Sequence, residues 1–404
     1  MNDHPAIIFA ALMIFVYGLF SKLADRSPVT APMVFVAMGI LVGPLVLDLF
    51  HMEINGGLIH ILTEVTLILI LFVDASTINL KQLVADRSVP IRMLGIGLPL
   101  TMLLGTLFAY LIFPELNIWM LVLMALILSP TDAALGQAVV KSEKVPERVR
   151  LWISVESGLN DGIALPPIFA CIAVLSVDTA GATEHHWILF LMQQILFGVL
   201  VGGSVGWVGG SLVNTCANKG WMNDTFQRLV SGSLAILCFV VAELVHGNGF
   251  IAAFAGGLML GFSSRSELIR ERIQEFGEAE GQQLILFVFL IFAMVMVPKA
   301  IEFWDVRAWF YAILSLTVIR MLPVAISLIG KKFDLATILF IGWFGPRGIA
   351  SVLYLLLVSA TLGLEGYEPI LSVIVLTVLL SVFLHGISAV ALSNHFSKVN
   401  KMID

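Results

Sequence analysis

Charged residues are scarce in this chain of 404 residues. Asp, Glu, Lys and Arg together make up 12% of the sequence, whereas hydrophobic residues make up 59% and the mean hydropathy is +1.00. A typical soluble domain carries about 25% charged residues. The composition therefore excludes a soluble globular protein, and the recurrence of apolar runs excludes an enzyme domain held by a single anchor. Together, the composition and the repeated apolar runs predict an all-α polytopic membrane protein.

Cysteine is equally scarce and histidine is scattered. Cys171, Cys216 and Cys238 lie in or beside apolar stretches without metal-ligand spacing, so we expect small buried side chains and no disulfides. The eight histidines form no HExxH or serine–histidine arrangement. We expect no enzyme activity, no nucleic-acid partner and no cofactor other than a transported ion. No cleavable signal peptide is evident, so the first apolar run is counted as a span.

Apolar runs long enough to cross a bilayer as helices recur along the whole chain, and we expect about 13 transmembrane helices. The predicted spans are residues 5–23, 28–49, 56–79, 90–113, 117–140, 150–176, 187–213, 226–246, 248–263, 282–301, 307–329, 335–361 and 368–393. The longest loop, Ser263 to Gly281, is rich in Glu and Arg and is expected to form a cytoplasmic connecting helix.

The basic residues orient these spans. When the loops are numbered alternately from an external N-terminus, the outer loops hold only Lys299 and Arg307, and nearly all other Lys and Arg residues fall on the inner side. Basic residues favour cytoplasmic loops. The sequence therefore predicts an external N-terminus and a cytoplasmic C-terminus.

Two acidic motifs interrupt apolar segments. One is Ser129-Pro130-Thr131-Asp132, and the other is Glu156-Ser157-Gly158-Leu159-Asn160-Asp161-Gly162. A carboxylate inside hydrocarbon costs several kcal/mol unless something offsets it, so it indicates function by default. The three carboxylates, the Asn160 amide and the hydroxyls of Thr131 and Ser157 lie within about thirty residues and predict a cation and proton site inside the membrane.

Two of the predicted spans should be broken helices. Pro130 removes a backbone donor from the fifth span, and Gly345-Pro346-Arg347-Gly348 should interrupt the twelfth. Because these spans are seven apart, their helices run in opposite directions, which is typical of an inverted-repeat transporter whose site lies near the midplane. Asp132 is expected to offset the positive helix ends and Arg347 the negative ends. A structural role is favoured more strongly for Arg347 than for Asp132.

The acidic helix of the sixth span carries two polar faces. Helical spacing pairs Glu156 with Asn160, and Ser157 with Asp161. We expect the second pair to face a cavity and to offer oxygen ligands, together with Asp132 and Thr131. For Glu156 we favour an ion pair with Arg320 over direct ligation, because a buried arginine needs a partner.

Asp161 is expected to hold either a proton or a cation. A carboxylate removed from water takes up a proton more readily, and a bound proton and a bound cation exclude each other. Competition for this one carboxylate is sufficient for obligatory exchange.

The chain resembles the monovalent cation/proton antiporter superfamily, and most closely the NhaP-type sodium/proton antiporters of bacteria and archaea. The matching stretches are Ser129-Pro-Thr-Asp-Ala-Ala134, Val155-Glu-Ser-Gly-Leu-Asn-Asp-Gly162, His246-Gly-Asn-Gly-Phe-Ile-Ala-Ala253, Arg320-Met-Leu-Pro-Val324 and Gly345-Pro-Arg-Gly-Ile349. They are spread over most of the chain.

The resemblance implies thirteen helices in inverted repeats with two crossing broken helices, a homodimer in a bacterial or archaeal cytoplasmic membrane, and elevator-like alternating access. It implies that Asp161 binds the ion and the proton, and that Ser157 and Thr131 help to coordinate the cation. Asn160 before Asp161 is the pattern associated with electroneutral one-for-one exchange. We expect one transporter unit over 1–404, with core-domain halves at 90–176 and 307–393, a dimerisation domain at 1–79 and 226–301, and a linking helix at 187–213.

Sodium is the favoured cation, with lithium or potassium as further substrates. The alternative is a potassium-selective antiporter or a channel-like potassium efflux system, and an intramembrane enzyme is favoured far less. Glu64, Glu243 and His246 are weaker signals, because each suits an ion path or a structural role.

Overall fold

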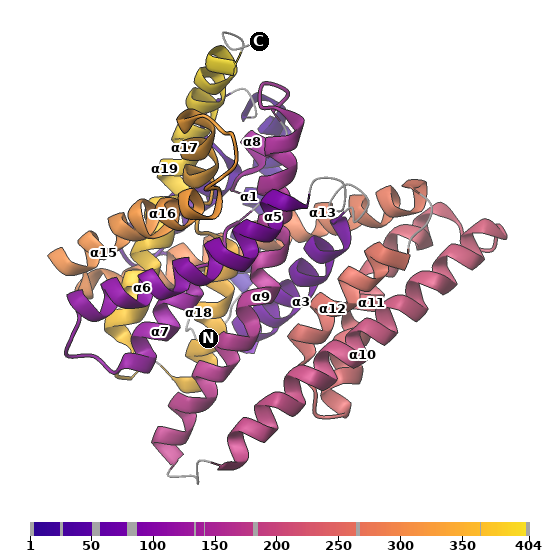
Figure 1. Cartoon of the computed structure of the whole chain (residues 1–404), viewed down its shortest axis with the longest axis horizontal. Coiled ribbons are helices and arrows are strands. Elements are labelled where there is room, and N and C mark those ends of the chain that lie inside the picture. Colours follow the sequence, from indigo (N-terminus) through magenta and orange to yellow (C-terminus); the bar gives the residue numbers. More distant parts are fainter. Residues whose placement is uncertain are drawn as a thin grey trace. The chain divides into compact units, whose positions relative to one another are not determined.

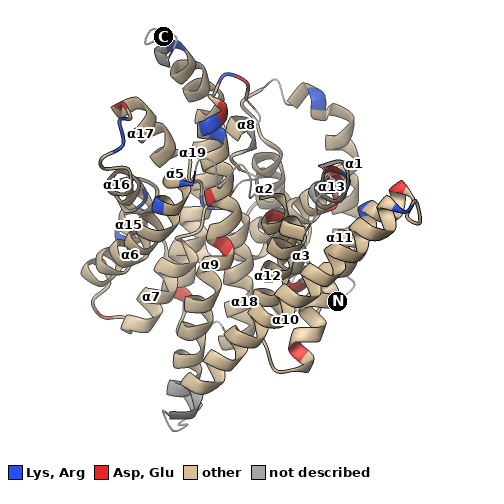
Figure 2. Ribbon diagram, turned by 45° about the vertical axis from the view of Figure 1, so that its right-hand side comes forward, with Lys and Arg blue, Asp and Glu red and all other residues tan. Residues whose placement is uncertain are grey.

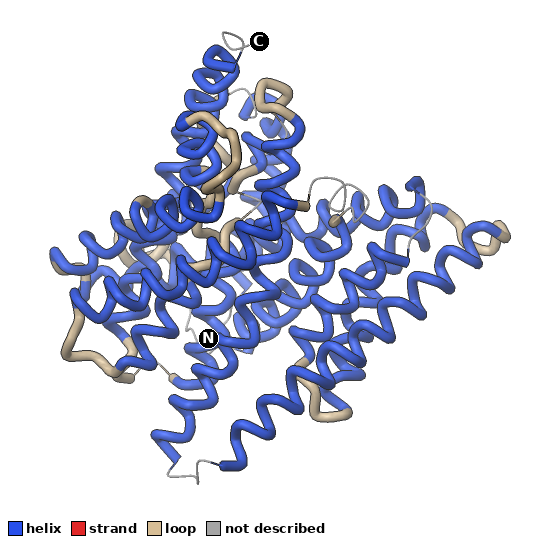
Figure 3. The backbone as a smooth tube through the Cα atoms, in the orientation of Figure 1, coloured by secondary structure: helices blue, strands red, loops and turns tan. Residues whose placement is uncertain are grey.

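The computed structural model describes residues 4–24, 27–50, 57–78, 87–132, 135–140, 142–180, 185–263, 267–363 and 365–400. Over these residues the chain forms helices joined by turns and loops, and no strand (Figures 1 and 3). It divides into two compact units. The first unit comprises residues 1–61, 88–157 and 285–404, and the second comprises residues 62–87 and 158–284.

The first unit contains most of the elements. They are α1 (His4–Ala24), α2 (Ala31–Val42), the first turn of α3 (Gly57–Thr77), α5 (Ser88–Arg92), η1 (Met93–Gly97), α6 (Leu98–Ile112), α7 (Ile118–Ile127), α8 (Gln137–Val140), the start of α9 (Glu147–Ala180), the end of α13 (Glu267–Ile291), η2 (Phe292–Met296), α14 (Val297–Ala300), η3 (Ile301–Phe303), α15 (Val306–Leu316), α16 (Val318–Ser327), α17 (Leu335–Trp343), α18 (Ile349–Leu362) and α19 (Glu368–Asn400). The second unit contains the remainder of α3, α9 and α13, together with α10 (His185–Asn218), α11 (Asp224–Leu244) and α12 (Gly249–Ser263).

The helices lie where the apolar runs predicted them. Among the described residues, nine helical segments are long and apolar enough to cross a membrane, and four shorter apolar helices occupy the second, fifth, ninth and twelfth predicted spans. Figure 2 shows long stretches of helix without an acidic or basic residue. Because length and composition alone identify these segments, the count of thirteen spans stays a prediction. The predicted connecting helix is present as the polar first half of α13.

Prolines shape two of the helices in the first unit. Pro99 follows the π-turn η1, and Pro298 follows the π-turn η2. A proline has no N–H to donate to the carbonyl one turn earlier, so the preceding turn widens into a π-helix and the chain continues as a helix.

A buried cluster stabilises one end of the first unit. Side chains of α5, η1, α8, α9, α16, α17 and α19 meet there, and the rings of Phe340 and Phe396 stack with centroids 4.2 Å apart. This packing joins α17 to α19 beside the break that follows Trp343. It therefore fixes the position from which the unwound chain begins.

In the second unit, small residues allow α10 and α12 to pack closely. The α-carbon of Gly206 faces the Gly256 backbone, and a Cβ at Gly202 or Gly206 would collide with the main chain of α12. These two glycines therefore provide close packing between α10 and α12.

Candidate functional site

The first broken helix is interrupted where the proline motif lies. Helix α7 begins after Asn117, whose side chain accepts a hydrogen bond from the Trp119 N–H at 2.8 Å, and it ends at Ile127. Residues 131 and 132 are not helical, and the short helix α8 begins at Gln137. The prediction of a break around Pro130 is confirmed.

The second broken helix is interrupted by the glycine–arginine motif. Helix α17 ends at Trp343, and α18 begins at Ile349. Both glycines of the motif face other groups at close range, because a Cβ at Gly345 would collide with the Arg320 guanidinium and a Cβ at Gly348 with the Asp132 carboxylate. The lack of side chains at these two positions lets the unwound chain pass between the two charges.

The two breaks contact each other through paired charges and helix ends. The carboxylate of Asp132 accepts a hydrogen bond from the Ile349 N–H at 2.7 Å, at the N-terminus of α18. The Arg347 guanidinium donates to the carbonyls of Ser129 and Pro130, beyond the C-terminus of α7. Each charge therefore offsets the helix end of opposite sign, in the arrangement expected from sequence.

Main-chain contacts complete the crossing. The Asp132 N–H donates to the Pro346 carbonyl at 2.8 Å, and the Ser351 hydroxyl donates to the Ile127 carbonyl at 2.7 Å. Backbone groups freed by an unwound stretch need such partners inside a membrane. The crossing thus satisfies groups that neither helix satisfies alone.

Glu156 and Arg320 form a buried ion pair between α9 and α16. The Arg320 guanidinium donates to the two Glu156 carboxylate oxygens at 2.5 and 2.6 Å. The arginine and glutamate side chains are 2% and 1% exposed. The pairing predicted from sequence is present, and the two-bond geometry fits the fork of a guanidinium.

Two of the predicted oxygen ligands lie together. The hydroxyls of Thr131 and Ser157 are 3.0 Å apart and both are buried. Thr131 immediately precedes Asp132, so two hydroxyls and a carboxylate gather at the first break. Among the described residues, no group of three or more His, Cys, Asp or Glu side chains is placed to hold a metal. A cation here would depend on hydroxyl and carbonyl oxygens beside carboxylates.

Asn160 and Asp161 are buried on the next turn of α9, within the second unit. Asp161 follows Ser157 by four residues on the same continuous helix, which places both on one face of it. Phe254 of α12 packs directly against Gly162. Whether Asp161 shares a cation with Asp132 stays a prediction.

Sequence reasoning missed two buried polar residues of α19. Ser381 accepts a hydrogen bond from the Arg347 N–H at 2.7 Å, and His385 lies 3.0 Å from the Trp343 carbonyl. Isolated polar residues in a long apolar span carry little signal. Their four-residue spacing, which places both on one helix face, was the available clue.

The weaker candidates have separate surroundings. The Glu243 carboxylate accepts from the Gly249 N–H at 2.9 Å and so caps α12. His246 is exposed in the preceding turn, with a positive φ of 59°. The capping contact favours a structural role for Glu243, and the exposed turn position of His246 fits a structural role as well. Glu64 is half-buried in α3.

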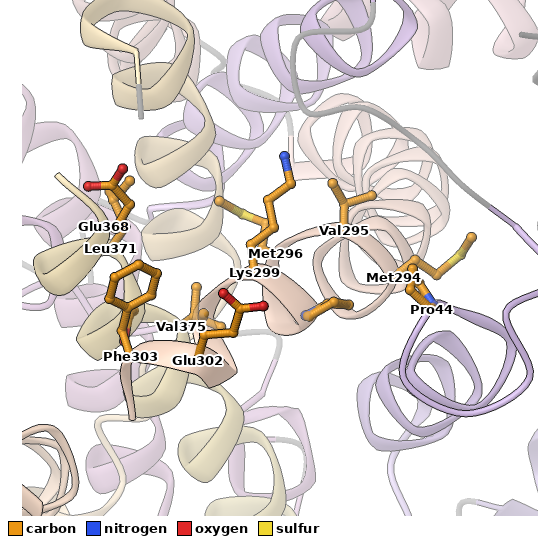
Figure 4. Close-up of a pocket in the computed structure, with 13 residues that line it drawn as sticks. Pro44, Met294, Val295, Met296, Lys299, Glu302, Phe303, Glu368, Leu371 and Val375 are labelled. Atoms are coloured by element: carbon orange, nitrogen blue, oxygen red, sulfur yellow. The ribbon is translucent and has the colours of Figure 1, made fainter. Parts of the chain in front are cut away.

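A cavity of about 530 Å³ lies elsewhere in the first unit (Figure 4). Its charged lining residues are Lys299, Glu302 and Glu368, and apolar side chains of η2, α14 and α19 form much of the remainder. None of the predicted site residues lines it.

The sequence of this chain is similar to those of known transport proteins. The family model described as "sodium/hydrogen exchanger, transmembrane" matches residues 8–395. The chain is 24% identical over 314 residues to a Na(+)/H(+) antiporter of Schizosaccharomyces pombe, covering 70% of this chain and 66% of that protein. It is 28% identical over 236 residues to the K(+)/H(+) antiporter NhaP of Alkalimonas amylolytica, covering 57% of this chain and 39% of that protein. The chain thus spans less than two thirds of the length of each of these relatives.

A solved structure shares the fold. The sodium proton antiporter MjNhaP1 from Methanocaldococcus jannaschii matches with a TM-score of 0.81 at 19% identity, covering 98% of this chain and 100% of that one. At this identity the likeness shows the fold alone. The prediction of an all-α polytopic membrane fold with two crossing broken helices is confirmed.

Proposed function

The chain belongs to the sodium/hydrogen exchanger family, and from this premise we propose that it exchanges a monovalent cation for a proton across the membrane that it crosses several times. One observation carries the proposal. At the meeting point of two broken helices, a buried carboxylate lies beside two hydroxyls that are 3.0 Å apart. Such a cluster of oxygens inside a membrane suits a cation path. Membership of a transporter family sets the intramembrane enzyme aside.

We assign different roles to Asp132 and Asp161. Asp132 is engaged with the N-terminus of α18 through the Ile349 N–H, so it keeps the helix ends in place and lends negative charge to the site. Asp161 is the group that alternates between a proton and a cation. Ser157 and Thr131 supply neutral oxygens, and Glu156, paired with Arg320, holds α9 against α16. Asn160, next to Asp161, packs inward and carries no proton.

One-for-one exchange follows from a single alternating carboxylate. Loading Asp161 with one proton in one direction and one monovalent cation in the other moves no net charge. Sodium is the cation that we favour, with lithium as a second substrate. Potassium is the alternative, and the resemblance to a K(+)/H(+) antiporter supports it.

The larger assembly is part of the same proposal. We place the chain in a bacterial or archaeal cytoplasmic membrane, with an external N-terminus and a cytoplasmic C-terminus, because basic residues gather on one side. The protein forms a homodimer through residues 1–79 and 226–301. The core halves at 90–176 and 307–393 move against it, with 187–213 as the linking helix.

The test is cation-driven proton movement in proteoliposomes that contain a pH-sensitive dye. Wild-type protein is challenged in turn with sodium, lithium, potassium and choline, and the same assay is run on Asp161→Asn. An amide coordinates a cation but does not exchange a proton, so we expect the variant to lose exchange while its melting temperature is kept.

Two outcomes would contradict the proposal. Wild-type rate in purified Asp161→Asn would remove the central role of this carboxylate. Large potassium currents without proton movement would instead indicate a channel.

A further inference from the structure

His385 is a buried imidazole near the middle of α19, and it is only 2% exposed. Both of its ring nitrogens have partners. Nε2 lies 3.0 Å from the Trp343 carbonyl, and Nδ1 lies 3.1 Å from the Ser381 hydroxyl and 3.0 Å from the Ser381 carbonyl. A buried polar ring is costly unless it is satisfied in this way. The contacts show where the ring is anchored.

The partners of His385 lie on both sides of the second helix break. Trp343 is the last residue of α17. The Arg347 N–H, two residues before α18, donates to the Ser381 hydroxyl at 2.7 Å. Ser381 and His385 are one helical turn apart, so one face of α19 contacts both ends of the unwound stretch 344–348.

The Trp343 side chain adds two further contacts to the same face. Its indole stacks on the His385 ring with centroids 4.8 Å apart, and its Nε1–H donates to the Ser388 hydroxyl at 2.9 Å. Residues 381, 385 and 388 thus form a stripe along α19 that we call the clamp.

In a neutral His385 ring the hydrogen bonds of the clamp have one direction. The Trp343 carbonyl has no proton to give, so Nε2 of His385 donates to it. Nδ1 then carries no proton, so its 3.0 Å contact with the Ser381 carbonyl is not a hydrogen bond, and Nδ1 accepts from the Ser381 hydroxyl, which in turn accepts from the Arg347 N–H. One chain of bonds therefore joins the carbonyl at the end of α17 to the N–H of Arg347, two backbone groups that have no partner within a helix. The Trp343 carbonyl also accepts from the Gly345 N–H at 2.8 Å, whereas the Arg347 N–H donates to the Ser381 hydroxyl.

The other side of the same stretch contacts Asp132. The Pro346 carbonyl accepts from the Asp132 N–H at 2.8 Å, and the Ile349 N–H donates to the Asp132 carboxylate at 2.7 Å. Segment 344–348 is thus held between the clamp and the first broken helix. A shift of this stretch would move the two groups that orient Asp132.

We propose that Ser381 and His385 are positioning residues for cation exchange, because they hold the second break, and through it Asp132, in the arrangement that binds the cation. This inference rests on the proposed function. A positioning role differs from a purely structural one. If Ser381 and His385 only satisfied buried polar groups, their loss would lower stability but would not change the apparent affinity of the folded protein for its cation.

The test uses four variants and a matched control. Ser381→Ala, His385→Leu, His385→Gln and the double variant Ser381→Ala/His385→Leu are reconstituted beside wild type. Thr377→Val is the control, because the Thr377 hydroxyl is also fully buried in α19 and donates to the Val373 carbonyl of its own helix at 2.7 Å. For the cation that wild type transports best, the apparent KM and the maximum rate are measured at one pH, together with the melting temperature.

We expect the apparent KM to rise at least threefold in Ser381→Ala and in His385→Leu, and to stay at the wild-type value in Thr377→Val. His385→Gln, whose amide nitrogen can take the place of Nε2, should recover part of the loss. The apparent KM of the double variant should be no higher than that of the more impaired single variant, because both changes break the same chain of bonds.

A change of less than threefold in KM in both single variants would overturn the positioning role, whatever happens to the melting temperature. If His385→Leu does not fold, Ser381→Ala still tests the proposal, because it removes only one hydroxyl. An inactive wild type with every cation would overturn the proposed exchange itself, and that result is distinct from an active wild type with unaffected variants.

Discussion

Removing the carboxylate of Glu156 should strongly destabilise the first unit. The Arg320 and Glu156 side chains are 2% and 1% exposed, and they share hydrogen bonds of 2.5 and 2.6 Å. Breaking a buried pair by deleting one partner costs about 3–5 kcal/mol, because the remaining charge has no compensation. At about 2–4 °C per kcal/mol, we expect the melting temperature of Glu156→Ala to fall by roughly 10 °C.

A second pair in the chain serves as a matched control. Arg307 approaches Glu115 at 2.5 Å, the same distance as in the buried pair, but these side chains are 51% and 50% exposed. Exposed ion pairs contribute little, because water solvates both charges when the pair is broken. Glu115→Ala should therefore melt at the wild-type temperature. The contrast compares a buried charge left without compensation with an exposed Arg307 that water and Asp305, at 2.9 Å, still compensate.

The assay is thermal unfolding of the purified protein in detergent, run beside proteoliposome exchange. Glu156→Leu combined with Arg320→Met removes both charges and should recover much of the stability that either single change loses. A normal melting temperature in Glu156→Ala together with lost transport would refute the reasoning. That result would place Glu156 at the ion site.

Three further predictions concern other parts of the chain. If Asp161 alone carries both ions, the exchange rate should be insensitive to an imposed membrane potential and bell-shaped in pH; a sustained potential-dependent current on a solid-supported membrane would show that a second proton is carried. Gly348→Ala should reduce exchange at least tenfold because its Cβ meets the Asp132 carboxylate, whereas Gly281→Ala, whose Cβ would meet no described atom within 4 Å, should not change the rate. Gly206→Ala should cost about 1–3 kcal/mol by overpacking α10 against α12, while Gly203→Ala, whose nearest neighbour in the described structure is at 3.6 Å, should be tolerated in thermal unfolding.

The fold could be predicted because a membrane requires the same hydropathy pattern of any sequence that spans it. Hydrocarbon demands long apolar helices, so span positions could be located from hydropathy alone. Proline and glycine marked the two breaks for a local reason, namely the missing donor of Pro130 and the missing side chains of Gly345 and Gly348. The predicted partnership of Glu156 with Arg320 followed from the cost of burying a lone charge, which left few candidates on either side.

The tertiary structure decided which groups meet across the crossing. No local rule specified that Asp132 would accept from the Ile349 N–H, or that Arg347 would donate to the Ser129 and Pro130 carbonyls. Hydrogen bonds to backbone groups leave no trace in residue type, since every residue offers the same N–H and carbonyl.

The α19 clamp is a second case in which residue type does not predict hydrogen bonds to distant backbone groups. Ser381 and His385 are ordinary residues in an apolar span, and their partners are the main-chain groups of Trp343 and Arg347, about forty residues earlier in the chain. By itself the sequence determined where helices form, where they break and which charges need a partner, because these depend on the chemistry of each residue and its neighbours. Only the tertiary structure decided how the broken ends are held, because that depends on which distant backbone groups folding brings within hydrogen-bonding distance.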